Sequence, residues 1–293
     1  MATLREIRRR ISGVKSTQKI TKAMKMVAAA KLRRAQEAVI AARPYAREMK
    51  SLLEQLGGVA DMTAHPLCAQ RPVHRVALIV VTSDRGLCGA FNSNVIRSTV
   101  SHIRRDYEDH LGSDRLRLIC IGRKGVDFFV KNRYPVAGKH LGVFASLDFG
   151  RASDIMNEAI SGFLGGQFDR VEVIYNEFKS IIHQRIVTEQ LLPIPAPVAA
   201  GPSSKIDFIY EPSGPELISA LVPKHLDFQL WRILLESNAS EQGARMTAMD
   251  NATSNASDLI KSLQLSYNKA RQASITKELL EIVSGAEALK NAE

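Results

Sequence analysis

The chain has 293 residues, of which 45% are apolar and 24% charged, with a formal net charge of +10. This composition is that of a globular protein and excludes wholesale disorder, and no apolar run approaches the ~18 residues that span a bilayer. The three cysteines, Cys68, Cys88 and Cys120, have neither zinc-site nor redox-motif spacing, which favours a reducing compartment.

The excess positive charge lies in one segment at the start of the chain. Residues 1–50 contain 14 Lys and Arg and three acidic residues, whereas the rest of the chain is close to neutral. From Ile7 to Gln36 there are ten basic residues and no acidic one. The charge pattern leaves three interpretations open: a helix that binds RNA or DNA, a helix that docks on an acidic protein surface, and a removable transit peptide or plain solvated face.

The first segment, from Thr3 to about Leu56, is predicted to be one long helix, because Gly13 and Pro44 are its only glycine and proline. Apolar residues recur at alternating spacings of three and four, the pattern of a coiled-coil seam. The seam blurs through Gln18 and Thr21. Its residues are Leu4, Ile7, Ile11 and Val14, then Ala28, Leu32, Ala35, Val39 and Ala42.

The middle of the chain, about Arg71 to Lys205, has the pattern of an α/β domain. Apolar β-rich runs at 76–82, 116–121 and 171–175 alternate with helical patterns at 93–109, 124–131 and 153–164. Continuously apolar strands between helices predict a parallel sheet that is covered on both faces. The segment 182–190 is predicted to be a further strand at the sheet edge. A stiff exit linker follows, with Pro193, Pro195, Pro197 and Pro202.

A second long helix is predicted to begin at Ser213-Gly-Pro-Glu216, which resembles a capping box with a proline in the first turn. Pro223 is expected to kink this helix. The apolar register then jumps to Ile275, Leu279, Ile282, Ala286 and Leu289, which indicates a change of winding or of partner. Before the jump, the seam keeps a 4-3 rhythm through Leu235, Ala239, Gln242, Met246, Met249, Thr253, Ala256, Ile260, Leu263, Tyr267, Ala270 and Ser274.

The two terminal helices are too long for one small domain to cover. At 1.5 Å per residue they would be roughly 80 Å and 100 Å long. We therefore expect them to pair with each other or with another protein. The small residues on both seams would let such helices approach closely.

Signatures of catalysis are weak. The segment Ser83–Asn92 follows a predicted strand, where a Rossmann fold binds phosphate, but Gly86 and Gly89 do not match G-x-G-x-x-G. A tight strand-to-helix turn is the favoured interpretation, and Gly122-Arg-Lys-Gly125 is interpreted in the same way. The seven histidines have no metal-site spacing. We predict no catalytic, cofactor-binding or metal-binding residue.

Three segments of the chain resemble the gamma subunit of F-type ATP synthase: Thr17–Lys31, Ser83–Gly89 and Gln264–Glu278. Arg43-Pro-Tyr45 and Glu241-Gln-Gly-Ala-Arg-Met246 strengthen the resemblance. It implies a long antiparallel coiled coil of N- and C-terminal helices plus a central Rossmann-like α/β domain. Residues 1–57, 71–205 and 213–293 would be the N-terminal helix, the α/β domain and the C-terminal helix.

The resemblance also implies a function. In that family the coiled coil is a noncatalytic rotor shaft inside a ring of three alpha and three beta subunits, and the α/β domain lies against the epsilon subunit and the c-subunit ring. The implied place is the cytoplasmic face of a bacterial inner membrane, since no leader precedes the matching motifs, and no cofactor is implied. Two alternatives stay open: a nucleic-acid-binding coiled-coil protein, and an α/β enzyme with a degenerate nucleotide turn.

Seven residues are implied to contact the ring. Met24 and Lys25 would lie near the beta subunit, and the C-terminal helix would add polar contacts through Arg245, Arg271, Gln272, Thr276 and Glu278. The alternative for the polar residues is an ordinary solvated helix, because surface pairs are commonly worth under about 1 kcal/mol. The apolar tail Ile275–Leu289 would fit a smooth sleeve at the top of the ring. The alternative interpretation is that these residues pack in the core of the protein. The cysteine pair of the family's plant branch has no counterpart here, so thiol switching is not expected.

Overall fold

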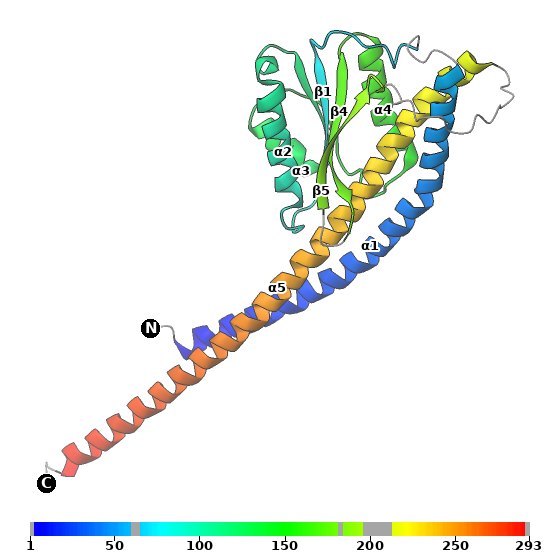
Figure 1. Ribbon diagram of the computed structural model, residues 1–293. Coiled ribbons are helices and arrows are strands. Elements are labelled where there is room, and N and C mark those ends of the chain that lie inside the picture. Colours follow the sequence, from blue (N-terminus) through cyan, green and yellow to red (C-terminus); the bar gives the residue numbers. More distant parts are fainter. Residues whose placement is uncertain (1–2, 60–64, 181–183, 196–212, 291–293) are drawn as a thin grey trace. The chain divides into compact units, whose positions relative to one another are not determined.

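The computed structural model describes residues 3–59, 65–180, 184–195 and 213–290, and places two long helices at the two ends of the chain with a five-stranded sheet between them in sequence (Figure 1). In the described residues no helix is long and apolar enough to cross a membrane. The elements are α1 (Leu4–Val59), β1 (Val76–Val81), α2 (Phe91–Asp106), η2 (Glu108–His110), β2 (Leu116–Ile121), α3 (Arg123–Lys131), β3 (Val136–His140), α4 (Phe149–Leu164), β4 (Arg170–Phe178), β5 (Gln184–Leu192) and α5 (Gly214–Lys290).

The chain forms two compact units. One consists of Met1–Val27 and Met246–Glu293, and the other of Ala28–Arg245. Both α1 and α5 contribute to both units, because neither helix is interrupted where the units divide. The three predicted domains, 1–57, 71–205 and 213–293, stay a prediction.

The sheet has the strand order β3-β2-β1-β4-β5. Strand β1 pairs in parallel with β2 and β4, and β2 pairs in parallel with β3. The expected parallel sheet is thus confirmed, and β5 takes the predicted edge position, antiparallel to β4. Strand β3 was not predicted, because its sequence Val-Ala-Gly-Lys-His lacks an apolar run in a strand that is only partly buried. The predicted linker prolines Pro197 and Pro202 lie outside the described residues.

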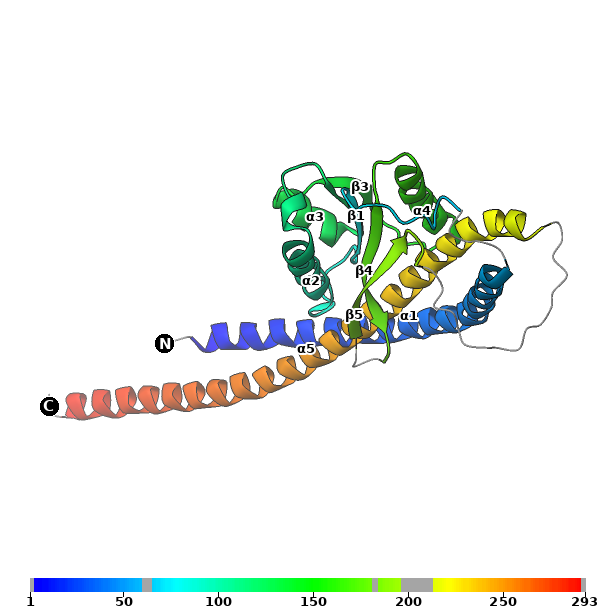
Figure 2. The same cartoon turned by 45° about the horizontal axis from the view of Figure 1, so that its top comes forward.

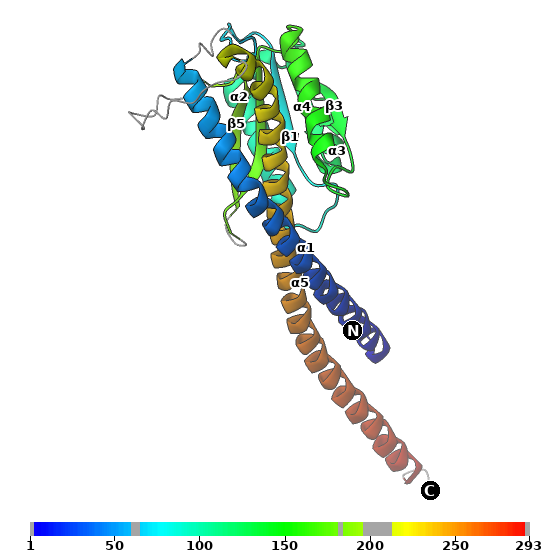
Figure 3. The ribbon, with the colours of Figure 1, turned by 90° about the vertical axis from the view of Figure 1, so that its right-hand side faces the viewer.

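Helices cover both faces of the sheet. One face packs through Leu78 and Val80 against Val95 of α2 and Phe129 of α3. The other face packs through Ile79 against α4 and the first part of α5, with the last turns of α1 in the same core (Figure 3). The six residues of β1 are fully buried, which explains why the sequence shows an unbroken apolar run there.

Helix α5 begins at the predicted cap. The backbone N–H of Glu216 donates to the Ser213 hydroxyl at 3.4 Å, which is one of the two hydrogen bonds of a capping box. The helix then continues through Pro223. Five of its apolar residues are completely buried in the core beneath the sheet, and these are Val222, Leu226, Leu230, Ile233 and Leu234.

In the unit that contains both chain ends, α1 and α5 run antiparallel (Figure 2). The Thr21 and Thr253 hydroxyls are 2.8 Å apart, and Arg8 Nη2 donates to the Tyr267 hydroxyl at 2.6 Å. Residues early in α1 therefore meet residues late in α5. The hydroxyl pair lies where the predicted apolar seam blurs, so a hydrogen bond replaces apolar packing at that level. All twelve seam residues predicted in the C-terminal helix are buried or half-buried.

Candidate partner-contact site

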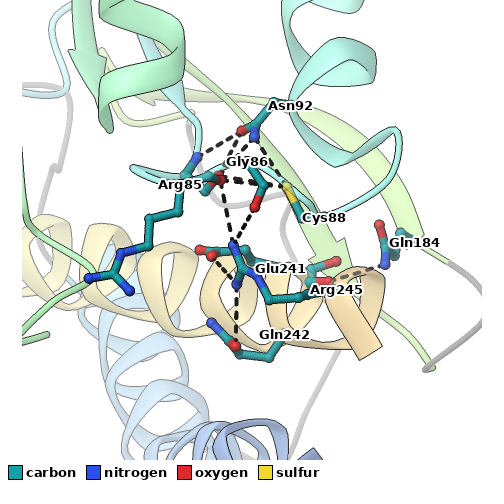
Figure 4. A network of polar contacts seen from close by, with 10 residues as sticks. Arg85, Gly86, Cys88, Asn92, Gln184, Glu241, Gln242 and Arg245 are labelled. Atoms are coloured by element: carbon teal, nitrogen blue, oxygen red, sulfur yellow. Dashed lines mark hydrogen bonds and ion pairs between the residues drawn. The ribbon is translucent and has the colours of Figure 1, made fainter. Parts of the chain in front are cut away.

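The segment between β1 and α2 is a tight turn that its own side chains hold closed (Figure 4). The backbone N–H of Ser83 donates to Asn92 Oδ1 at 2.9 Å, and the Ser83 hydroxyl donates to the Arg85 carbonyl at 2.6 Å. Asn92 Nδ2 also donates to Cys88 Sγ at 3.2 Å. Asn92, on the first turn of α2, thus anchors both ends of the turn.

A side chain of this turn binds the start of a neighbouring helix. Asp84 Oδ1 accepts hydrogen bonds from the backbone N–H groups of Arg123, at 3.1 Å, and Gly142, at 3.0 Å. Arg123 is the first residue of α3, and helix N-termini favour negative charge. The carboxylate of Asp84 therefore caps the first turn of α3 and ties that helix to the turn. In the described part of the chain no three His, Cys, Asp or Glu residues are grouped to hold a metal ion.

Arg245 joins α5 to the turn. Its Nη2 donates to the carbonyl oxygens of Gly86 at 3.3 Å and Arg85 at 3.5 Å, and its Nη1 donates to Glu241 Oε1 at 2.5 Å (Figure 4). Gln242 Oε1 lies 3.3 Å from the same Nη1. The resemblance implied that Arg245 contacts a partner, whereas its guanidinium points at the chain's own turn.

Glu241 supports this arginine from inside the protein. Burial raises the pKa of the Glu241 carboxyl, and the adjacent Arg245 guanidinium opposes that shift. Only 12% of the Arg245 side chain and 6% of the Glu241 side chain are exposed. In the sequence, Glu241 stood out only within a matching motif, because its burial depends on tertiary packing, although its partner Arg245 lies one helical turn away.

Leu87, at the tip of the turn, was not among the predicted contact residues. Its side chain is 64% exposed and its φ is +65°, in the left-handed region that costs an L-residue about 1–2 kcal/mol. The basic side chains of Arg85 and Lys124 are also exposed, and the ε-carbon of Lys124 lies near Gly86. The sequence offered one signal for Leu87 as a contact residue: it is apolar and lies between Gly86 and Gly89, after a buried strand.

The other predicted contact residues lie in the unit of the paired helix ends. Met24 is half-buried, and Lys25 Nζ forms an ion pair with Asp250 at 2.6 Å. That pair is largely exposed, so it contributes little to stability. On α5, the remaining four predicted residues are exposed on two successive turns. These are Arg271, Gln272, Thr276 and Glu278.

The apolar end of α5 has the character of a contact surface. Ile275, Leu279 and Ile282 are all more than half exposed, although they are large and apolar. The register jump predicted here thus coincides with the loss of a buried seam. Leu289, the last predicted residue of this tail, has no described side chain.

The three cysteines are free and buried. Burial raises the pKa of Cys88, and it raises the pKa of Cys120 to about 12. Thiols of this kind are poor nucleophiles. The chemistry of the turn therefore rests on hydrogen bonding and charge.

A second polar cluster fastens α5 to the sheet edge. Arg232 Nη2 bonds Glu189 Oε2 on β5 at 2.9 Å, and Arg232 Nη1 bonds Glu236 Oε1 at 3.2 Å. Tyr175 donates its hydroxyl to Glu189 at 2.6 Å. Burial raises the pKa of the Glu236 carboxyl, the Arg232 guanidinium opposes this, and the nearby carboxylates of Glu177 and Glu189 add to it.

Replacing Glu236 with glutamine is expected to raise stability at high pH relative to the wild type. A raised pKa means that the folded state holds the proton more tightly than the unfolded state, so wild-type stability declines as pH rises above 4.5 through the folded pKa. Glutamine still offers an oxygen to Arg232 and carries no charge. The difference in unfolding free energy, variant minus wild type, should become more positive from about pH 4 to about pH 8 in urea titrations. A difference that stayed constant with pH would contradict the assignment.

Comparison with known proteins agrees with this architecture. The family profile described as "ATP synthase" matches residues 3–289. The chain is 53% identical to the ATP synthase gamma chain of Chloroherpeton thalassium, with 99% of each chain covered. It is 54% identical to the ATP synthase gamma chain of Chlorobium phaeobacteroides, with 99% of this chain and 100% of that one covered.

Solved structures show the same fold at low identity. A chain of the Euglena gracilis mitochondrial ATP synthase (OSCP/F1/c-ring) aligns with a TM-score of 0.69 at 21% identity, covering 98% of this chain and 94% of that one. A chain of the Tetrahymena thermophila mitochondrial ATP synthase central stalk and c-ring aligns with a TM-score of 0.62 at 24% identity, covering 80% and 99%. Since the family profile and these relatives cover nearly the whole chain, the protein belongs to the ATP synthase gamma chain family.

Proposed function

We propose that this chain is the noncatalytic central shaft of an F-type ATP synthase, which couples transmembrane ion flow to ATP synthesis or hydrolysis at the beta subunits by rotating inside the ring of alpha and beta subunits. The observation that carries the proposal is the antiparallel pairing of the two chain ends, in a chain similar over its full length to ATP synthase gamma chains. The alternative of a nucleic-acid-binding coiled coil has no such support.

The paired helices have the properties that a shaft needs. Small residues such as Ala256 on the seam allow α1 and α5 to approach closely, which keeps the pair thin. The basic residues of α1 remain largely on the surface, and the exposed ones include Arg9, Arg10, Lys15, Lys19, Lys22, Arg33 and Arg34. A positive surface of this kind favours acidic surfaces on surrounding subunits.

We place the ring contacts on the exposed parts of the two helices. Met24 and Lys25 would face a beta subunit, and Arg271, Gln272, Thr276 and Glu278 would make polar contacts from α5, with the apolar tail that begins at Ile275 above them. The partners would be three alpha subunits, three beta subunits, the epsilon subunit and the c-subunit ring. The chain would be peripheral to the membrane, at the cytoplasmic face of a bacterial inner membrane. This placement rests on its similarity to ATP synthase gamma chains of Chlorobium phaeobacteroides and Chloroherpeton thalassium.

Assembly with partner subunits tests the proposal. Mixing the purified chain with alpha and beta subunits should yield one copy per hexamer and should raise ATP hydrolysis, because the shaft makes the beta sites alternate. Salt-sensitive binding of duplex DNA or RNA without hexamer assembly would contradict it, and so would ATP hydrolysis by the chain alone.

The proposed contact residues can be tested in the same complex. Arg271→Ala should lower ATP-driven proton pumping several-fold in inverted vesicles relative to ATP hydrolysis. The control is Arg117→Ala, which removes a half-buried arginine of β2 that pairs with Asp114 and should leave the ratio unchanged. Equal ratios in the two variants would argue against a contact at Arg271.

A further inference from the structure

We infer that Arg245 is a positioning residue that holds the turn 83–89 in the conformation in which Leu87 faces the ring. The inference rests on the proposed function, because it assigns Arg245 a role inside the chain in place of the direct ring contact that the resemblance implies. Both Arg245 and the turn belong to the unit Ala28–Arg245.

The geometry of Arg245 is that of a clamp between two elements. A guanidinium carries five N–H donors in a rigid plane. Here Nη1 donates to Glu241 Oε1 on α5, one helical turn earlier. The other terminal nitrogen, Nη2, donates to two successive carbonyl oxygens of the turn, those of Arg85 and Gly86 (Figure 4). A lysine in this place could not reach both elements with the same planar arrangement.

The clamp is buried, which leaves little of it for a partner. Arg245 exposes only 12% of its side chain. The second carboxylate oxygen of Glu241, Oε2, is buried without a hydrogen-bond partner among the described residues. The positive charge of Arg245 compensates the buried carboxylate of Glu241. Removing the arginine would therefore leave a buried negative charge without that compensation. The pair is built to hold the turn on α5.

The turn is held on both sides of a strained residue. The Gly86 carbonyl is bonded by Arg245, and Cys88 Sγ accepts a hydrogen bond from Asn92. Between them, Leu87 keeps φ at +65° with its side chain exposed. Such strain persists only where the surroundings over-determine the backbone, and it gathers at functional sites. The free chain gains nothing from an exposed leucine in this conformation.

The surroundings of Leu87 indicate the chemistry of its partner. The turn itself contributes the exposed side chain of Arg85, and the exposed Lys124 reaches Gly86 with its ε-carbon. An apolar side chain with adjacent positive charges fits an acidic segment of the ring that also offers an apolar residue. Glu241 therefore holds Arg245 in place, Arg245 holds the turn in place, and the turn contacts the ring.

Hydrogen exchange of the turn tests the first part of this inference. In the purified full-length chain, Arg245→Ala should speed exchange in the peptide that covers residues 83–92 several-fold, because the two carbonyls lose their donor. Arg271→Ala, which removes an exposed arginine of the same helix, should leave this peptide unchanged. Arg245→Lys and Glu241→Gln should give intermediate exchange, and they keep the test informative if the alanine variant does not fold.

Coupling in the assembled complex tests the second part. Arg245→Ala should lower the ratio of proton pumping to ATP hydrolysis several-fold, with partial rescue in Arg245→Lys. Leu87→Gly relieves the backbone strain and removes the exposed side chain, so the chain should unfold at an unchanged or higher urea concentration while the coupling ratio falls.

Two results would overturn the inference. If Arg245→Ala impaired coupling while exchange of the turn stayed at the wild-type rate, Arg245 would be a direct ring contact. If Leu87→Gly kept the full coupling ratio, the turn would have no contact at Leu87. Failure of the proposed function is distinguishable from both, because a wild-type chain that does not assemble with alpha and beta subunits would leave the exchange measurement on the free chain intact.

Discussion

Replacement of Gly122 with alanine is expected to lower the free energy of unfolding by about 3 kcal/mol or more. Gly122 has a φ of +91°, and a Cβ there would lie 2.0 Å from the carbonyl oxygen of Thr82. The Thr82 backbone cannot give way cheaply. Its N–H donates to the Ile121 carbonyl at 2.8 Å, and its hydroxyl accepts from the N–H of Gly125 at 2.8 Å. Backbone strain and a steric clash therefore act together at this position.

The matched control for this substitution is Gly112→Ala. Gly112 also has a positive φ, +85°, but nothing lies within 4 Å of a Cβ at that position. Gly112→Ala should lower the free energy of unfolding by only about 1 kcal/mol, the cost of the backbone conformation alone. Urea unfolding of the purified chains measures both values. Similar losses in the two variants would mean that the contact with Thr82 relaxes easily.

Leu230→Ala is expected to lower the free energy of unfolding by about 3 kcal/mol. Leu230 is completely buried in the core that α5 shares with the sheet and α4. Its truncation removes apolar contacts and leaves a cavity that a close-packed core fills only partly. The loss should appear as a lower urea midpoint with an unchanged slope. This core fastens α5 to the α/β fold, so the same variant should also weaken transmission of torque from the helix to the sheet.

An exposed leucine on the same helix provides the control. Leu265 is 64% exposed, and Leu265→Ala should change the free energy of unfolding by no more than about 0.5 kcal/mol. The two substitutions remove the same atoms from the same element, so their difference measures burial against the sheet. A small effect at Leu230 would show that the first part of α5 is not held by this core.

The predictions made from sequence succeeded where a local period or run reports burial directly. The 4-3 rhythm from Leu235 to Ser274 marks the side of α5 that is covered, because a helix repeats its faces every three or four residues. The apolar runs at 76–81 and 116–121 mark strands that are buried on both faces. The strand β3 was missed because Gly138 and Lys139 interrupt its pattern at a half-exposed edge.

The amino-acid sequence alone determined the long helices, the buried strands, the positive segment and the family. The tertiary structure decided what the polar side chains do. The direction of Arg245, the placement of Asp84 at the start of α3 and the left-handed backbone at Leu87 each depend on groups that are distant in sequence or on a turn that is closed by such groups. A period in the sequence reports which face of an element is buried, whereas a hydrogen bond between elements depends on how the chain brings them together.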